Sequence, residues 1–394
     1  MKENFNVDAG YDLIVIGGGI NGAGVVRDAA LRGLKVILIE KGDFCSGTTS
    51  WSTRLIHGGL RYLEYFAGAL VRESLHEREI LLHTAPHLVK PLLLTIPIYS
   101  DRSRPYWKIQ VGMCLYDVLS YDKTLPSHRM LSQQQLRQIF CSIDPENLLG
   151  GAQYYDAQVA YVERLVLENI LSAEAAGATV LNYVEVMQLN REGERITSLT
   201  CRNCLTGEAF TVRGREDAVI VNTSGPWVDE VLSRGRQNGS AAPIGGERKI
   251  GGTKGSHLLV APFSGAPQAS ALYVEAKSDS RPFFIVPWLG MLLIGTTDIH
   301  HTGKLDEIKA GNEEIDYLLS ETNKIMPTAR LSREDVKFTY SGVRPLPNSE
   351  SQKPGSITRR HRIYDHSSEG ITNLISLIGG KITTYRQVGQ EIVD

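Results

Sequence analysis

The sequence of 394 residues lacks the features that mark several classes of protein. It has only five cysteines, an odd number, which argues against a framework of disulfides and favours a reducing compartment, the cytoplasm. No apolar run reaches the roughly 18 residues of a membrane-spanning helix, and the N-terminal stretch lacks the apolar core of a signal peptide. The net charge is −2, without a long block of one sign, which argues against nucleic acid as a partner.

What the sequence does contain is a nucleotide-binding pattern from Asp12 to Glu40. Residues 13–16 predict a buried strand, and a glycine-rich turn, an amphipathic helix and a second apolar strand follow. The glycines, with the spacing G-x-G-x-x-G, are Gly17, Gly19 and Gly22. The first permits a tight turn, the second lets a pyrophosphate approach the backbone, and the third lets helix and strand pack closely. Together these elements predict a dinucleotide-binding βαβ unit.

The ends of this unit indicate how a dinucleotide is held. The helix begins at Ile20 and Asn21, where unpaired N–H groups and the positive end of the helix dipole favour phosphate. Glu40 ends the second strand, at a distance along the chain where a carboxylate accepts the ribose hydroxyls of an adenosine. An acid at this position disfavours a 2′-phosphate, so the sequence argues against NADP.

A loop rich in hydroxyl groups follows Glu40 and precedes a second glycine turn. Short donors of this kind suit a pyrophosphate and a ribityl chain, and a merely solvated loop is the alternative. The candidate cofactor-binding residues here are Lys41, Ser46, Thr48, Thr49, Ser50, Ser52, His57, Gly58, Gly59 and Leu60.

Two amphipathic or apolar helices are predicted next. The first covers Glu64–His83, and its two histidines, His76 and His83, have no third ligand in the sequence, so we predict no metal site. The second covers Trp107–Tyr121 and is apolar on most sides. We expect it to be buried against the rest of the protein, with docking on a bilayer surface as the alternative.

The remainder of the chain alternates between the two kinds of structure. A helix over 159–177 and a buried strand ending in a small-residue turn predict a second contribution to the nucleotide site, with Val186, Ser224, Gly225 and Trp227 as candidates. Residues 235–252 suggest a connection between domains. Period-two strands then predict an antiparallel sheet with its own helix over Glu313–Ile325. The C-terminal stretch repeats the order strand, glycine turn and helix, with Gly380, Lys381, Ile382 and Thr383 at the turn.

These motifs resemble the FAD-dependent glycerol-3-phosphate dehydrogenases and the related α-glycerophosphate oxidases. The matching stretches are IGGGINGAG, STRLIHGGLRYLE, PHLVKPLLL, NTSGPW, KGSHLLV, PWLGMLLIGTTD, YSGVRPL, SITR and GGKITTYR. Thr223 replaces the usual alanine of the NATGPW-like turn. Members of the family usually continue into a helical C-terminal domain, whereas this sequence stops soon after GGKITTYR, and whether it is a short form or a trimmed chain stays open.

The resemblance implies an α/β fold: a Rossmann-like FAD-binding domain of the glutathione-reductase type with a substrate domain built on an antiparallel β-sheet. It implies an FAD-binding domain formed by residues 1–85, 151–235 and 341–394, and a substrate domain formed by 86–150 and 236–340. The implied reaction is the oxidation of sn-glycerol 3-phosphate to dihydroxyacetone phosphate, by hydride transfer from C2 to flavin N5. Electrons would pass to a quinone or to oxygen, with possible contact between the protein and the cytoplasmic face of a membrane.

The resemblance also implies the substrate residues. Arg61, Arg344 and Arg359 fall in matching motifs, and an arginine suits a phosphate by its fork of donors. Thr297 and Lys381 are further substrate candidates. Lys381 and the start of the last helix are expected to stabilise negative charge.

A base must take the hydroxyl proton. We predict His257 in this role, with Tyr62 assisting, because imidazole titrates in the useful range.

Two other functions stay open at this point. One keeps the flavin and changes the substrate to another hydroxy acid or an amino acid. The other is a flavoprotein without this turnover, either an electron-transfer subunit or an inactive short form. The sequence leaves the electron acceptor and the oligomeric state open as well.

Overall fold

The computed structural model describes residues 10–235, 246–349 and 357–394. Part of the predicted connection at 235–252 lies outside these residues. The helices are α1 (Ile20–Leu31), α2 (Gly68–Thr84), α3 (Tyr106–Leu119), α4 (Gln133–Ile139), α5 (Val162–Ala175), α6 (Val228–Ser233), α7 (Asn312–Ile325) and α8 (Tyr385–Val393).

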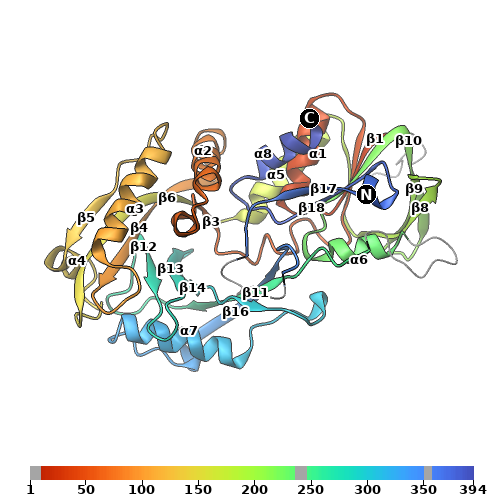
Figure 1. The fold of residues 1–394 in the computed structure, drawn as a ribbon. Helices are drawn as coiled ribbons and strands as arrows, with labels where there is room; N and C mark the ends of the chain where they lie inside the picture. The colour runs from red at the N-terminus through yellow and green to blue at the C-terminus, as the bar shows by residue number, and fades with distance from the viewer. Residues whose placement is uncertain (1–9, 236–245, 350–356) are drawn as a thin grey trace.

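Two sheets organise the chain, and Figure 1 shows them in two halves that lie side by side. The first sheet has the order β17-β18-β10-β1-β2-β7, with the hairpin β8–β9 continuing from β10. Its strands are β1 (Tyr11–Ile16), β2 (Val36–Ile39), β7 (Thr179–Leu181), β8 (Val184–Glu192), β9 (Arg195–Asn203), β10 (Ala209–Asn222), β17 (Arg362–Asp365) and β18 (Leu374–Ile378). The pairs from β18 to β7 are parallel, as the nucleotide-binding pattern predicts.

The second sheet has the order β15-β11-β14-β13-β12-β4-β6-β3, with β16 beside β11 and β5 beside β6. Its strands are β3 (Leu55–Ile56), β4 (Val89–Tyr99), β5 (Arg129–Ser132), β6 (Leu148–Val159), β11 (Thr253–Val260), β12 (Ser270–Glu275), β13 (Pro282–Trp288), β14 (Met291–Gly295), β15 (Ile299–His300) and β16 (Val336–Arg344). Among the described residues of this sheet, β4 and β12 are the one parallel pair, so the prediction of an antiparallel sheet is confirmed for the other pairs.

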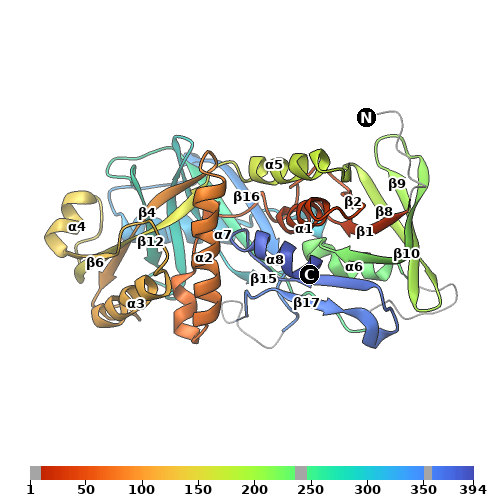
Figure 2. The ribbon, with the colours of Figure 1, turned by 90° about the horizontal axis from the view of Figure 1, so that it is seen from above.

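The core follows this division in part. The helices α1 and α5 cover one face of the first sheet, and their apolar side chains form one cluster with residues such as Val15, Val25, Leu38 and Val166. Figure 2 shows α1, α5 and α8 gathered beside β1 and β2. Separate clusters fill the second half, one beneath α7 and one beneath α2 and α3. The cluster under α1 and α5 also includes Ile56, Val89 and Val159 of the second sheet, so this core joins the two halves.

The two halves are interwoven along the chain. The N-terminal βαβ unit and the C-terminal β18 and α8 lie in the same half, and α1 packs against α8. The strand β6 runs past the predicted boundary at residue 150, and β16 runs past the one at 340. The boundaries of the five predicted segments stay a prediction.

Two predictions about helices are wrong in part. The helix predicted over Glu64–His83 is split, because Phe66 has φ 55° and ends a 3₁₀ helix (Leu60–Tyr65) before α2 begins. The apolar helix near Trp107 is α3, and it is not buried as expected. Only Met113 and Tyr116 are buried, because α3 meets its neighbours along one edge, and Trp107 stays 66% exposed.

Candidate active site

A cavity of about 760 Å³ runs between the two halves. One end lies at the glycine turn after β1 and the start of α1, and the other is lined by residues of β11, β13 and β16. Its size is in the range of roughly 300–1,000 Å³ that ligand sites occupy. The two ends differ in construction.

Backbone builds the first end. Gly17 has φ 106°, and a Cβ on it would lie 2.8 Å from the carbonyl oxygen of Thr223. At Gly22, a Cβ would lie 1.9 Å from the carbonyl oxygen of Gly17. Only glycine fits at these two positions. No side chain caps the start of α1, although the N–H of Ile20 donates to Thr49 Oγ1 at 3.3 Å, so the helix dipole faces the cavity.

Glu40 lies beside this turn. Its Oε2 accepts the N–H of Gly18 and its Oε1 accepts the N–H of Gly42, each at 2.7 Å. Each carboxylate oxygen keeps a second lone pair, so the side chain is held by the backbone and can still accept a hydroxyl group. The predicted contact with ribose hydroxyls stays a prediction.

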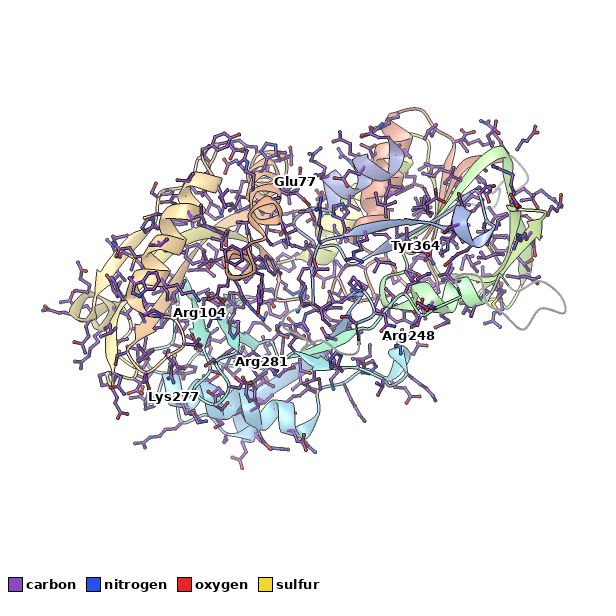
Figure 3. All side chains as sticks on the ribbon, in the orientation of Figure 1. Glu77, Arg104, Arg248, Lys277, Arg281 and Tyr364 are labelled. Atoms are coloured by element: carbon purple, nitrogen blue, oxygen red, sulfur yellow. The ribbon has the colours of Figure 1, made fainter. Side chains whose placement is uncertain are left out.

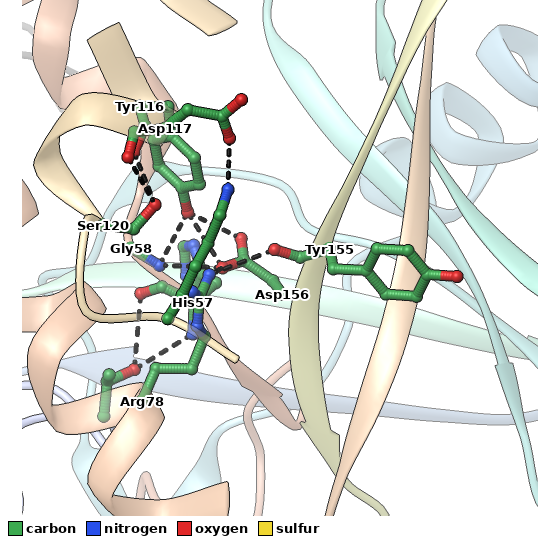
Figure 4. A network of polar contacts seen from close by, with 10 residues as sticks. His57, Gly58, Arg78, Tyr116, Asp117, Ser120, Tyr155 and Asp156 are labelled. Atoms are coloured by element: carbon green, nitrogen blue, oxygen red, sulfur yellow. Dashed lines mark hydrogen bonds and ion pairs between the residues drawn. The ribbon is translucent and has the colours of Figure 1, made fainter. Parts of the chain in front are cut away.

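The backbone at His57, Gly58 and Gly59 lies beside the cavity, which His57 and Gly59 line. The N–H of His57 donates to Thr383 Oγ1 at 3.2 Å, and the N–H of Gly58 donates to Asp156 Oδ1 at 3.3 Å and to the Tyr116 hydroxyl at 3.0 Å. The fully buried Arg78 holds Asp156 through a contact of 2.6 Å. Figure 4 shows this network from β6 to α2. These hydrogen bonds hold the backbone of residues 57–59 from both sides.

Charged side chains build the other end. Arg344, the last residue of β16, places its two Nη atoms within 3.4 Å of four acceptors: Thr253 Oγ1, Asp298 Oδ1, Thr296 Oγ1 and the Thr297 carbonyl. Burial lowers the pKa of Arg344 to about 10, which leaves it a cation at neutral pH. Arg359 Nη2 donates to the other oxygen of Asp298 at 3.1 Å.

Lys381 lies between this end and α2. Its Nζ donates to Ser74 Oγ at 2.7 Å and stands 4.6 Å from the centre of the Tyr62 ring. Burial lowers the pKa of Lys381 to about 7, and the nearby Arg359 adds to that effect, while Glu73 and Asp156 oppose it. Near neutral pH, Lys381 is therefore present as both amine and ammonium.

His257, on β11, is 2% exposed. Its Nε2 lies 2.9 Å from Thr53 Oγ1, and its ring stacks on Tyr340 with centroids 4.8 Å apart. Burial, together with the charges of Arg344 and Arg54, lowers the pKa of His257 to about 3. The imidazole is neutral at physiological pH, but it binds a proton weakly.

The comparisons with known proteins agree with this geometry. Residues 12–386 match the family described as FAD dependent oxidoreductase. The chain belongs to this family. FAD is its cofactor.

A glycerol-3-phosphate dehydrogenase of Synechocystis sp. is 65% identical over 98% of this chain and 69% of that protein. A D-erythritol 1-phosphate dehydrogenase of Brucella abortus is 42% identical over 96% of this chain and 72% of that protein. The solved glycerol-3-phosphate dehydrogenase of Bacillus halodurans, complexed with FAD, has a TM-score of 0.76 and 30% identity, and this chain covers 64% of it. The chain thus spans about two thirds of these relatives.

The cavity fits FAD. The glycine turn at Gly17 and Gly19, which lines the cavity, and the uncapped start of α1 suit its pyrophosphate. Across the cavity, Lys41 Nζ and Trp227 Nε1 both contact Asp306 Oδ1, at 3.1 and 3.3 Å. Asp306 belongs to the loop after β15, so the second half also closes over this end.

Most of the predicted site residues line the one cavity. These are Gly17, Gly19, Ile20, Asn21, Glu40, Lys41, Ser46, Thr48, Thr49, Ser52, His57, Gly59, Leu60, Arg61, Tyr62, Val186, Ser224, Gly225, Trp227, His257, Thr297, Arg344, Arg359, Gly380, Lys381, Ile382 and Thr383. Three others are absent from the lining. Gly22 and Gly58 face protein atoms, and the Ser50 hydroxyl donates to the Cys45 carbonyl at 2.6 Å. The direct cofactor contact predicted for Ser50 therefore lacks support.

Sequence reasoning missed several residues of the lining. Asp298 ends the matched stretch PWLGMLLIGTTD, but no role was predicted for it, since that role depends on two arginines far along the chain. Arg281, labelled in Figure 3, begins the approach to β13 and also lines the cavity, as do the ring residues Tyr273 and Phe284. From the sequence, an arginine just before a strand is expected at the surface, and only the fold shows that Arg281 lines the cavity.

Proposed function

We propose that this chain oxidises sn-glycerol 3-phosphate to dihydroxyacetone phosphate. The observation that carries the proposal is the cationic end of the FAD cavity, which Arg61, Arg344 and Arg359 line beside Lys381. A small phosphate ester needs such a clamp for its dianion. The names of the relatives at 65% and 30% identity support the same substrate.

The proposed arrangement places the phosphate against the arginines and the C2 hydroxyl toward Lys381. Arg359 offers charge-assisted hydrogen bonds to the phosphate oxygens, and Arg344 contributes chiefly its charge, because protein acceptors surround its Nη atoms. Arg61 completes the proposed substrate contacts, whereas the buried Thr297 hydroxyl donates to Glu314 Oε1 and has no proton left for the substrate. FAD supplies the acceptor for the hydride that leaves C2. The protein residues orient the alcohol and take its proton.

We propose Lys381 as the acceptor of that proton, in place of His257. An efficient base has a pKa near the working pH. The pKa of Lys381 is lowered to about 7, whereas that of His257 is lowered to about 3. His257 also has Nε2 beside Thr53 Oγ1, so its role is to pack against Tyr340 and hold the loop that carries Thr53. Tyr62 lies against Lys381 and orients it.

A second candidate substrate is a longer phosphorylated polyol. The relative at 42% identity is named D-erythritol 1-phosphate dehydrogenase. The same arginines suit either phosphate. Comparing kcat/KM for the three-carbon and four-carbon phosphates decides between them: the proposal expects the three-carbon substrate to be preferred by about tenfold or more, in line with the 1–3 kcal/mol that a misfit group costs in a fitted pocket.

We further propose that α3 docks on a bilayer surface and that a quinone accepts the electrons. The large apolar side chains Trp107, Val111, Val118 and Tyr121 are 66, 59, 67 and 78% exposed, and Phe66, before α2, is 98% exposed. Within the described residues, none of the helices is long and apolar enough to cross a membrane. An exposed apolar helix face beside a redox cavity suits shallow contact with lipid.

Sedimentation with lipid vesicles tests the docking. Replacing Trp107 and Phe66 by Ser should release the protein into the supernatant while the flavin absorption stays unchanged. The matched control replaces Leu205, which is 64% exposed on the other half, by Ser. Equal sedimentation of all three proteins would refute docking through α3.

The experiment that tests the reaction is anaerobic mixing of the FAD-loaded protein with sn-glycerol 3-phosphate. The proposal expects the visible flavin absorption to bleach and dihydroxyacetone phosphate to form in equal amount. A flavin that stays oxidised would refute the substrate and leave the family assignment intact.

A further inference from the structure

Asp298 is a buried carboxylate between two cations at the substrate end of the cavity. Its Oδ1 lies 2.9 Å from Arg344 Nη1, and its Oδ2 lies 3.1 Å from Arg359 Nη2. The Asp298 side chain is 10% exposed, and those of Arg344 and Arg359 are 22% and 14% exposed. Since each carboxylate oxygen contacts a different guanidinium, Asp298 sets how far apart the two arginines lie.

The residues before Asp298 hold it in place. Thr297 Oγ1 donates to Glu314 Oε1 at 2.6 Å and accepts the N–H of Ser256 at 2.9 Å. Glu314, at the start of α7, also accepts the Ser256 hydroxyl at 2.7 Å and pairs with Lys254 at 2.7 Å. Thus β11 and α7 anchor the peptide of Thr297 from outside the cavity. The direction of the Asp298 side chain follows from this anchor.

The charge of Asp298 matters because its partners share a sign. Burial raises the pKa of Asp298, but the charges of Arg344 and Arg359, with a hydrogen bond from Thr253 and the charge of Arg281, together lower it by more, so the carboxyl is ionised at neutral pH. Without this charge, two guanidinium groups would face one another in a partly desolvated site and repel. Arg344 has three other acceptors to hold it. Arg359 depends more on Asp298, its partner at 3.1 Å.

We propose that Asp298 is a positioning residue that spaces and aims Arg344 and Arg359 for the phosphate of the substrate. The inference rests on the proposed oxidation of a phosphate ester and adds the residue that sets its selectivity. Asp298 does not contact the reacting atoms. It keeps the donors of Arg359 directed into the cavity. The arginines are then already in place when phosphate binds, and binding does not have to order them.

The test is Asp298→Asn, which keeps the shape and one acceptor oxygen but removes the charge. KM for sn-glycerol 3-phosphate should rise about tenfold or more, the size expected for losing one hydrogen bond to a charged group. The inhibition constant for inorganic phosphate should rise in parallel. The value of kcat should change little, because the proton acceptor and the flavin site are untouched. Turnover of unphosphorylated glycerol, however slow, should be unaffected.

The matched control is Asp279→Asn. Asp279 is an exposed partner of Arg281 at 3.4 Å. Like Asp298→Asn, this substitution removes one negative charge near the cavity, but it leaves the partners of Arg344 and Arg359 in place. It should leave the KM and the inhibition by phosphate unchanged. If both variants raise KM alike, or if Asp298→Asn leaves KM unchanged or lowers it, the proposal is overturned.

A second variant covers a failure to fold. If Asp298→Asn purifies without flavin, Asp298→Glu is measured in its place. This variant keeps the negative charge but shifts the carboxylate by the length of one methylene group. KM must then rise while the flavin spectrum stays that of the wild type, and an unchanged KM overturns the proposal. Failure of the proposed function looks different, because the wild-type flavin would then not be reduced by sn-glycerol 3-phosphate at all.

Discussion

The two ends of the cavity hold their ligands in different ways. At the nucleotide end, the site is formed mainly by contiguous backbone: a glycine turn, the start of α1 and the two N–H groups that hold Glu40. At the substrate end, side chains from distant parts of the chain converge, namely Arg61, Asp298, Arg344, Arg359 and Lys381. Substitutions of the backbone-defining glycines should therefore abolish FAD binding at the first end. Substitutions of single side chains at the second end should change KM or kcat by graded amounts.

The largest effect is expected at Gly22. In Gly22→Ala, the new Cβ would lie 1.9 Å from the Gly17 carbonyl oxygen, so β1 and α1 must separate and the phosphate site is lost. The protein should purify without bound FAD, measured as the ratio of flavin to protein absorbance. Gly112→Ala on α3 is the control, because a Cβ there meets nothing within 4 Å. A Gly22→Ala protein with a full complement of FAD would contradict the claim that the glycine backbone forms the nucleotide end.

A large effect on rate is expected at Lys381. Lys381→Met should lower kcat by about 10²- to 10⁴-fold, the contribution typical of a general base, without loss of FAD. The wild-type profile of kcat/KM should rise with pH through about 7, since the amine form is the active one and dominates above its lowered pKa. A profile that falls through that range, or a His257→Gln variant that abolishes the rise, would assign the base elsewhere.

An intermediate effect is expected at Arg359. Arg359→Ala should raise KM for sn-glycerol 3-phosphate by about 10- to 100-fold, as charge-assisted hydrogen bonds are worth about 1.5–3 kcal/mol. Bound FAD should be retained, measured by its absorbance. Arg333→Ala is the control, since Arg333 pairs with the exposed Asp316 on α7, away from the cavity. Equal KM values for the two variants would contradict a phosphate contact at Arg359.

The smallest effect is expected at Asp306, a side-chain contact at the nucleotide end. Asp306→Ala removes its contacts with Lys41 and Trp227, and both Asp306 and Lys41 are partly exposed. Exposed pairs contribute at most about 1 kcal/mol, so FAD should dissociate up to about fivefold faster, followed by the recovery of its fluorescence. A change of 100-fold would mean that this end also depends on side chains.

The same contrast explains what the sequence could predict. The nucleotide end is local: strand, glycines, helix and Glu40 follow one another within 12–40, so spacing alone predicts them. The resemblance to a known family then supplied Arg61, Arg344, Arg359 and Lys381, although they are far apart. Asp298 ends the matched stretch PWLGMLLIGTTD, but its role was missed because that role depends on β16, which brings Arg344 beside it.

Burial and local conformation were harder to predict than motifs. The apolar α3 was expected inside, but the hydrophobicity of a helix does not reveal how many neighbours it has. Ser50 has the same composition signal as Ser46 and Thr49, yet its hydroxyl turns inward to Cys45. The pKa of His257 depends on its burial among β11 and β16, which no spacing in the sequence reports.

The most direct test of the account is reduction of the bound FAD by substrate without oxygen. The account predicts that sn-glycerol 3-phosphate bleaches the visible flavin band of the wild-type protein with a saturable rate. Arg359→Ala should need a much higher substrate concentration to reach a similar limiting rate. If glycerol without its phosphate reduces the wild-type flavin as efficiently, the cationic end does not select a phosphate ester, and the central claim is contradicted.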